Sequence, residues 1–470
     1  MSSPAQFSPL AAIPSSMDPP SAAGGRTVFR RVLSRRDLIL YGLVILTPTA
    51  PFPIYGIIQR VSNGHAALSY IVAMLAVLCT AASYSKMSAA YPFSGSAYTY
   101  SNRALSPYLG FFAGWAMILD YVLIPLLSVV YASLIAGRLL PRIPYPVWAL
   151  AFTAAITCVN VRGIRATARA GAIMLSLMTA CAALFVVLAS KFIVSGYGWS
   201  ALVSASGLLR PEAFAMRPLM LGAGIATVSY IGFEAISTLA EDAIDPRRDI
   251  GFATVSVCLL QTLVCVAIVY LAALAWPYER GFAQVETAIL DLAIRVGGSF
   301  MLAFLTLVLM VSALASALAG QACASRLLYG MGRDGLLSRR LFAHLHPRHA
   351  TPVRAIYLMA AACFSGSLIL RFQLAVEILN FGALTAFVLV NLCVVRHYFI
   401  RLALRRGGYF FGNLVFPLLG AMVSSYLWIS LSTKAKIAGL VWLAAGAIYL
   451  LALTRGFRVL PKPLDFTEAD

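Results

Sequence analysis

Two apolar segments of this chain are interrupted in the middle, and they occupy matching places five spans apart. The first, residues 40–54, carries Pro48, Pro51 and Pro53, and the second, residues 222–234, is rich in glycine. Backbone in hydrocarbon must satisfy its own hydrogen bonds, so an unwound stretch is tolerated only where it lines a cavity enclosed by protein. Interrupted helices at corresponding positions of two halves predict the substrate site of a transporter. A simple proline kink is the alternative explanation.

The composition places the chain in the membrane. Of its 470 residues, 61% are hydrophobic and only 11% are charged, and the mean hydropathy of +0.85 excludes a soluble globular protein. Apolar runs of about 20 residues, the length that crosses a bilayer as a helix, recur along the chain. We therefore predict an all-α integral membrane protein with twelve transmembrane helices, at residues 38–60, 66–90, 106–138, 144–160, 171–193, 218–241, 250–275, 298–322, 355–371, 374–395, 409–431 and 435–454.

The distribution of basic residues predicts the orientation. The net charge is +19, and with the N-terminus inside, most of the 36 Lys and Arg lie on the cytoplasmic side. This bias explains the charge better than nucleic-acid binding does, and it predicts a multi-pass protein of the plasma (inner) membrane with both termini cytoplasmic. Residues 1–35 have no apolar signal sequence and are predicted to be a disordered cytoplasmic tail. The transporter domain is expected at 36–455, followed by a second cytoplasmic tail at 456–470.

The sequence contains no pattern that indicates an enzyme or a cofactor. It has no glycine-rich phosphate loop, no nucleophile–base pair and no metal-ligand spacing, so we predict neither cofactor nor metal. The eight cysteines lie within or at the ends of apolar spans without CxxC pairs, which predicts packing roles rather than disulfides or zinc.

Two carboxylates alone lie deep within predicted spans, and both are functional candidates. An ionisable group in the bilayer interior costs several kcal/mol. Asp120 falls near one helical face with Met117, beside Tyr121, which predicts a partner for a substrate ammonium; a structural Asp bonded to a neighbouring helix is the alternative. Glu234 directly follows the second interruption, which predicts gating or proton coupling, or else a structural tie between the broken helices.

Several of these motifs resemble those of a known family. Residues 230–241 (YIGFEAISTLAE) and 325–335 (SRLLYGMGRDG) resemble signatures of the amino acid–polyamine–organocation superfamily, and the chain is most similar to its putrescine importer group. The resemblance extends to residues 47–49, 95–100, Asp120-Tyr121 and 380–384.

The resemblance implies a five-plus-five inverted-repeat (LeuT-like) fold with broken helices 1 and 6. Its first repeat would run over about 38–193 and its second over about 218–395, with the last two spans at about 409–454. It implies alternating access and a substrate site formed by Thr47, Thr49, Ala50, Met117, Asp120, Tyr121, Tyr230, Ile231 and Gly232, with Glu234 in coupling or gating.

The chain also departs from the family pattern. Thr47-Pro48-Thr49 stands where amino-acid carriers usually have a Gly-Ser-Gly turn. Met178 stands near the position of a lysine that some relatives use in proton coupling, and Pro53 stands where putrescine importers carry an acid. The last difference weakens the assignment of a diamine.

The prolines of the first interruption bear on the substrate. Pro48, Pro51 and Pro53 have no backbone N–H, so this interruption has few donors for an α-carboxylate, whereas Asp120 suits an ammonium. We therefore predict a proton-coupled importer of a small cationic amine, similar to putrescine or a polyamine. A proton-coupled amino-acid permease or exchanger is the alternative, followed by a membrane-embedded enzyme or a receptor. The partners expected are the substrate, protons and the lipid bilayer.

Overall fold

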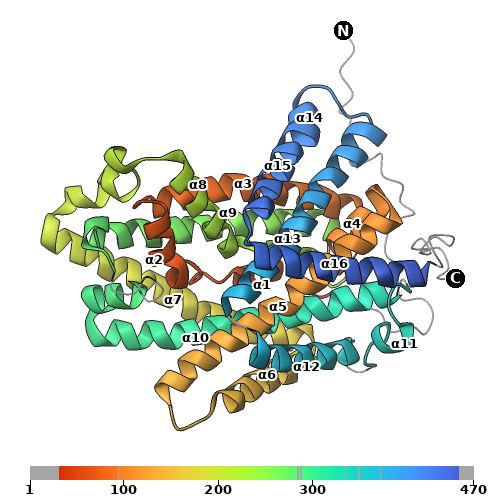
Figure 1. The fold of residues 1–470 in the computed structure, drawn as a ribbon, viewed down its shortest axis with the longest axis horizontal. Coiled ribbons are helices and arrows are strands. Elements are labelled where there is room, and N and C mark those ends of the chain that lie inside the picture. Colours follow the sequence, from red (N-terminus) through yellow and green to blue (C-terminus); the bar gives the residue numbers. More distant parts are fainter. Residues whose placement is uncertain are drawn as a thin grey trace.

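The structure is a bundle of helices, and many of these helices are long and cross one another (Figure 1). This computed structural model describes residues 31–454 except 94, 283–284, 286–287, 334, 348–349 and 371. The main helices are α1 (Arg35–Leu46), α2 (Pro51–Val61), α3 (Ala66–Ala90), α4 (Ala97–Ala104), α5 (Pro107–Leu139), α6 (Tyr145–Val161), α7 (Ile164–Tyr197), α8 (Met216–Ala226), α9 (Pro246–Ala275), α10 (Ala288–Arg333), α12 (Val353–Ile369), α13 (Phe372–Val394), α15 (Phe416–Ser430) and α16 (Thr433–Leu453).

The apolar lengths of these helices identify a multi-pass membrane protein. Among the described residues, nine helical segments are long and apolar enough to cross a bilayer, and the bent pair α1–α2 supplies a tenth. Helices α6 and α12 are apolar but shorter, with 17 residues each. Their positions match the predicted fourth and ninth spans, and the total of twelve spans stays a prediction.

The first predicted span is divided into two helices. Helix α1 ends at Leu46 and α2 begins at Pro51, and the two axes are bent by 55°. Thr47 follows α1 with a φ of 54°, which a β-carbon disfavours, and Pro51 begins α2, where a missing N–H is tolerated. We refer to α1 and α2 together as span 1, and to residues 47–50 as its break.

The sixth predicted span is also interrupted. Helix α8 is followed by the tight turn η6 (Thr227–Tyr230), then by Ile231 in extended conformation and Gly232 at φ 116°, and then by η7 (Phe233–Leu239). The two tight turns are 3₁₀ segments, and Gly232 supplies a backbone conformation that other residues rarely adopt. We refer to this set as span 6, and to Ile231-Gly232 as its break.

Helix α5 lies at the centre of the packing. It contacts α10 and α13 extensively, and also α4, α6, α12 and α16. Helix α3 packs against α9 and α8, while α15 and α16 contact the bundle mainly through α13, α3 and α5. In Figure 1, α15 extends beyond the body of the bundle. Asp120 therefore lies on a helix that packs against at least six others.

Three features differ from the sequence predictions. The end of the predicted disordered tail is ordered, because the N–H groups of Val32 and Leu33 both donate to the Asp242 carbonyl at 2.9 Å and α1 already begins at Arg35. Residues 1–30 and 455–470, which hold the rest of the two predicted tails, lie outside the described residues. Helix α10 extends beyond the predicted span 298–322 on both sides and is kinked at Gly298. Cys158 is exposed, so it is not a packing residue.

Candidate substrate site

The breaks of spans 1 and 6 lie against each other. A β-carbon on Gly232 would overlap the Ile45 side chain, so only glycine lets span 6 approach the end of α1 this closely. Gln261 of α9 links the break of span 1 to the turn just before the break of span 6. Its Nε2 donates to the Thr47 carbonyl at 2.9 Å and also lies 3.5 Å from the Ser229 carbonyl of η6. Predicted site residues that are far apart in the sequence therefore form one region.

The break of span 1 uses its own backbone donors. The N–H of Thr47 donates to Leu43 at 2.9 Å, that of Ala50 to Thr47 at 2.9 Å, and that of Phe52 to Thr49 at 3.1 Å. The Thr49 hydroxyl donates to Ser312 of α10 at 2.6 Å. With Pro48 and Pro51 contributing no N–H, these bonds leave little with which span 1 could hold a substrate carboxylate.

The break of span 6 contains its own carboxyl group. The N–H of Gly232 donates to Glu234 Oε2 at 3.0 Å, and the N–H of Ala235 returns to the Gly232 carbonyl at 3.1 Å. Glu234 is 1% exposed. The exposed N–H groups of an interrupted helix form an anion-binding position, and here the chain's own carboxylate binds one of them.

Asp120 is fully buried and is not tied to a neighbouring helix. Its side chain is 0% exposed, and within the described part of the chain neither carboxylate oxygen has a hydrogen-bond partner. The backbone of α13 approaches it, because a β-carbon on Gly382 would lie 3.3 Å from Asp120 Cβ. Glu234 is near enough for its charge to act on Asp120.

A cluster of four aromatic rings, which includes Phe233, adjoins Glu234. The ring of Tyr84 on α3 lies 6.0 Å from Tyr100, 5.5 Å from Phe233 and 6.1 Å from Phe387, and all three contacts are edge-on. The charges of Glu234 and Asp120 act on both Tyr84 and Tyr121. An anion within an aromatic enclosure can hold an organic cation through both charge and ring faces.

Sequence reasoning did not identify Tyr84 or Gln261. Gln261 could have been found, because it is the one amide in the otherwise apolar stretch 250–275. Tyr84 repeats the position of Tyr70 after fourteen residues, which places both on one face of α3. Which of the two tyrosines faces the acids depends on tertiary packing.

Some predicted site residues have other contacts. The Tyr230 hydroxyl lies 2.9 Å from the Thr262 hydroxyl and donates to the Tyr70 carbonyl at 3.4 Å, so it fastens span 6 to α9 and α3. Ile231 lines a small hollow together with residues of α3, α13 and α15, such as Thr80 and Leu427.

The other predicted residues lie at the break and on α5. Met117 and Thr49 are buried, Thr47 is 8% exposed and Ala50 is half-buried. Over the residues that the structure describes, no group of three metal-ligating side chains is found.

The family described as "Amino acid permease" matches residues 49–450. The chain belongs to the amino acid permease family. This permease is 31% identical to the "Low-affinity putrescine importer PlaP" of Escherichia coli (strain K12) over 436 residues, covering 92% of the chain and 96% of that protein.

Two further relatives come from Bacillus subtilis (strain 168). The permease is 26% identical to a "Methylthioribose transporter" over 458 residues, covering 92% of the chain and 95% of the relative. It is 26% identical to the "Branched-chain amino acid permease BcaP" over 460 residues, covering 93% and 95%. The resemblance seen in the sequence and the prediction of a transporter rather than an enzyme are confirmed. These relatives carry different substrates, so membership of the family leaves the substrate open.

Proposed function

We propose that this permease imports a small cationic amine, of the putrescine or polyamine class, together with protons. One observation carries the proposal: Asp120 is a fully buried carboxylate with no protein partner among the described residues, on the central helix, beside aromatic rings. A buried charge is costly unless it is paired. A substrate ammonium would supply the missing partner.

The hydrogen bonds of the two breaks support a substrate without an α-carboxylate. The N–H groups of Thr47, Ala50 and Phe52 are bonded within span 1, and the N–H of Gly232 is bonded to Glu234. A substrate carboxylate would compete with these bonds and would meet two buried acids. A diamine has no carboxylate to compete for these N–H groups, and its ammonium groups would be attracted to the two acids.

The mechanism that we propose follows from the position of the breaks. Substrate held between spans 1, 3, 6, 8 and 10 would be exposed alternately to each face, and Glu234, within span 6, would exchange the coupling proton or gate the site. This proposal includes twelve spans arranged as two inverted repeats, in the plasma (inner) membrane, with both termini cytoplasmic.

An amino-acid permease is the second candidate. It is favoured by the 26% identity to a branched-chain amino acid permease over 93% of the chain. In that case the α-carboxylate of the substrate would need backbone donors at the breaks, where the N–H groups of Thr47, Ala50 and Gly232 are already bonded.

Counterflow in proteoliposomes tests the proposal. Putrescine and cadaverine should compete at least about tenfold better than ornithine and lysine, a difference of about 1.4 kcal/mol, because the amino acids add a carboxylate to the same amines. Asp120→Asn should abolish high-affinity putrescine binding, since removing one partner of a desolvated ion pair costs about 3–5 kcal/mol.

The control variant is Asp291→Asn, which removes a carboxylate from the first turn of α10, outside the site. It should bind putrescine like the unmodified protein. Normal putrescine affinity in Asp120→Asn would contradict the role of Asp120. Equal competition by ornithine or by a neutral amino acid would favour the amino-acid permease.

A further inference from the structure

A second cavity lies at the end of the bundle where α2 and α9 end. Its volume is about 370 Å³, which is in the range of small-molecule sites. It is lined by the segments that join α7 to α8 and α9 to α10, and by the end of α2, and it does not include Asp120 or Glu234. In the predicted orientation this is the outer face, so the cavity lies where an imported substrate would arrive.

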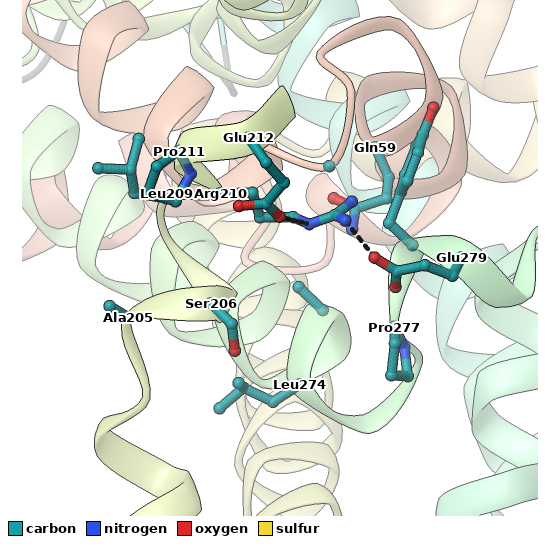
Figure 2. A pocket seen from close by; sticks show the side chains of 13 residues that line it. Gln59, Ala205, Ser206, Leu209, Arg210, Pro211, Glu212, Leu274, Pro277 and Glu279 are labelled. Atoms are coloured by element: carbon teal, nitrogen blue, oxygen red, sulfur yellow. Dashed lines mark hydrogen bonds and ion pairs between the residues drawn. The ribbon is translucent and has the colours of Figure 1, made fainter. Parts of the chain in front are cut away.

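Two carboxylates converge on one cation in this cavity. Figure 2 shows Arg210 between Glu212 and Glu279. Its Nε lies 3.4 Å from Glu212 Oε1, its Nη2 forms an ion pair with Glu279, and its guanidinium lies over the Tyr278 ring, 5.1 Å from the centroid. Two acids and an aromatic face are the elements from which sites for organic cations are built.

A buried amide also faces this cavity. Gln59 of α2 is one of the lining residues and is only 2% exposed, and its Oε1 has no hydrogen-bond partner in the described part of the chain. A buried polar atom is normally paired. An amide oxygen accepts hydrogen bonds, so the partner that suits it is a donor such as an ammonium.

The backbone of Arg210 is fixed, whereas its side chain is held by weak pairs. Its N–H donates to His65 Nε2 at 3.2 Å, which anchors the loop to the turn before α3. The side chains of Glu212 and Glu279 are 67% and 63% exposed. Ion pairs with exposed carboxylates contribute little stability and are screened by salt. Another cation could therefore displace the guanidinium, which is itself 16% exposed, while the backbone stays bonded to His65.

We propose that this cavity is an outer capture site for an aliphatic diammonium ion, in which Arg210 is the resident cation that the substrate displaces. A diamine carries a charge for each of the two carboxylates that Arg210 now bridges, and Gln59 would accept a further hydrogen bond. The proposal rests on the proposed function, because it takes the same substrate class one step earlier on its path.

Two substitutions distinguish this proposal from a purely structural ion pair by the direction in which each changes the dissociation constant for putrescine. Glu279→Gln removes an anion from the site, and Arg210→Met removes the competing cation while keeping an unbranched stem against Gly64. If Arg210 competes with the substrate, the dissociation constant for putrescine should rise about two- to fivefold in Glu279→Gln and fall about two- to fivefold in Arg210→Met. If the Arg210–Glu279 ion pair is purely structural, both variants should change the dissociation constant in the same direction, because both break that ion pair.

The measurement is calorimetric titration of putrescine into the purified full-length protein. The titrations use the Asp120→Asn background, in which only the outer site should bind, and are repeated on the natural background. Asp291→Asn serves as the matched carboxylate control and should leave the outer site unchanged. Arg210→Gln replaces Arg210→Met if the latter does not fold, with the same expected decrease.

The outcomes separate the two proposals. Changes of opposite sign support the capture site, whereas changes of the same sign, or no change in either variant, overturn it. Failure of the proposed function appears elsewhere, as unaltered high-affinity binding after Asp120→Asn. The signs of the Arg210 and Glu279 variants can still be compared in that case.

Discussion

The two interrupted spans meet in the middle of the bundle but obtain their hydrogen bonds from different sources. In span 1, the carbonyls of Leu46 and Thr47 are bonded by Gln261, a side chain of α9 more than two hundred residues away. In span 6, the N–H of Gly232 is bonded by Glu234, two residues further along the same segment. The carbonyls at the end of α1 are thus bonded from a neighbouring helix, whereas the N–H of Gly232 is bonded within span 6.

This difference has a mechanical consequence. Span 1 is tied to α9 at the Leu46 and Thr47 carbonyls, so a movement of α9 would act on the start of the break. Span 6 carries its carboxylate with it, so its N–H stays satisfied when the span moves. Protonation or deprotonation of Glu234 would therefore change its hydrogen bond to the Gly232 N–H directly. Substitutions at each break can test this comparison.

The largest effect is expected from Gly232→Ala. The φ of 116° and the overlap of a β-carbon with Ile45 should together destabilise the protein by about 3–5 kcal/mol. The measurement is the thermal unfolding of the purified protein. Gly196→Ala is the control, because nothing lies within 4 Å of its β-carbon position and alanine favours the helix by up to about 1 kcal/mol. Equal stability of the two variants would show that span 6 does not need glycine.

Two substitutions of Glu234 distinguish a structural role in span 6 from a role in proton coupling. Glu234→Ala removes the acceptor of the Gly232 N–H and should cost about 2–3 kcal/mol, whereas Glu234→Gln keeps an acceptor oxygen and the fold. If Glu234 exchanges the coupling proton, Glu234→Gln should lose pH-driven uptake but retain exchange of substrate for substrate. Both activities are measured in proteoliposomes. Full activity of Glu234→Gln would leave only the structural tie.

Gln261→Leu should weaken span 1 specifically. It leaves the Leu46 carbonyl without its donor and removes one of two donors to the Thr47 carbonyl, at a cost of about 1–2 kcal/mol, and should slow transport. Gln321→Leu is the matched control, since Gln321 of α10 bonds Thr157 and Asn160, away from the breaks. Both variants should lose similar stability, but only Gln261→Leu should lose transport. The same uptake rate in both variants would show that the bonds from Gln261 of α9 to span 1 are not needed for transport.

The smallest effect is expected from Thr49→Val. It removes the hydrogen bond to Ser312 and should cost about 1 kcal/mol, with a modest change in the KM of uptake. Thr306→Val, which removes a bond within one turn of α10, is the control and should leave the KM unchanged. A larger effect on KM at Thr306 would argue against a role for the span 1 break in binding.

The sequence determined the features that depend on local chemistry. Ten of the twelve predicted spans coincide with helical segments that are long and apolar enough to cross a bilayer, one of them the bent pair α1–α2, because the length of an apolar run alone determines whether it can cross hydrocarbon. The interruptions at residues 47–50 and 231–232 could be predicted because proline and glycine act on their own backbone. Asp120 and Glu234 could be selected because a carboxylate deep within an apolar span is costly wherever it lies.

Tertiary structure alone decided which groups these residues meet. The link from Gln261 to the breaks, the approach of Gly382 to Asp120, the ring of Tyr84 beside the acids, and the convergence of Glu212 and Glu279 on Arg210 all join residues from different helices or loops. Tyr230 was placed in the site by its neighbours in sequence, yet its hydroxyl is bonded to α3 and α9. Hydrophobic length and backbone propensity are local properties, whereas hydrogen-bond partners and electrostatic neighbours are set by how the helices pack.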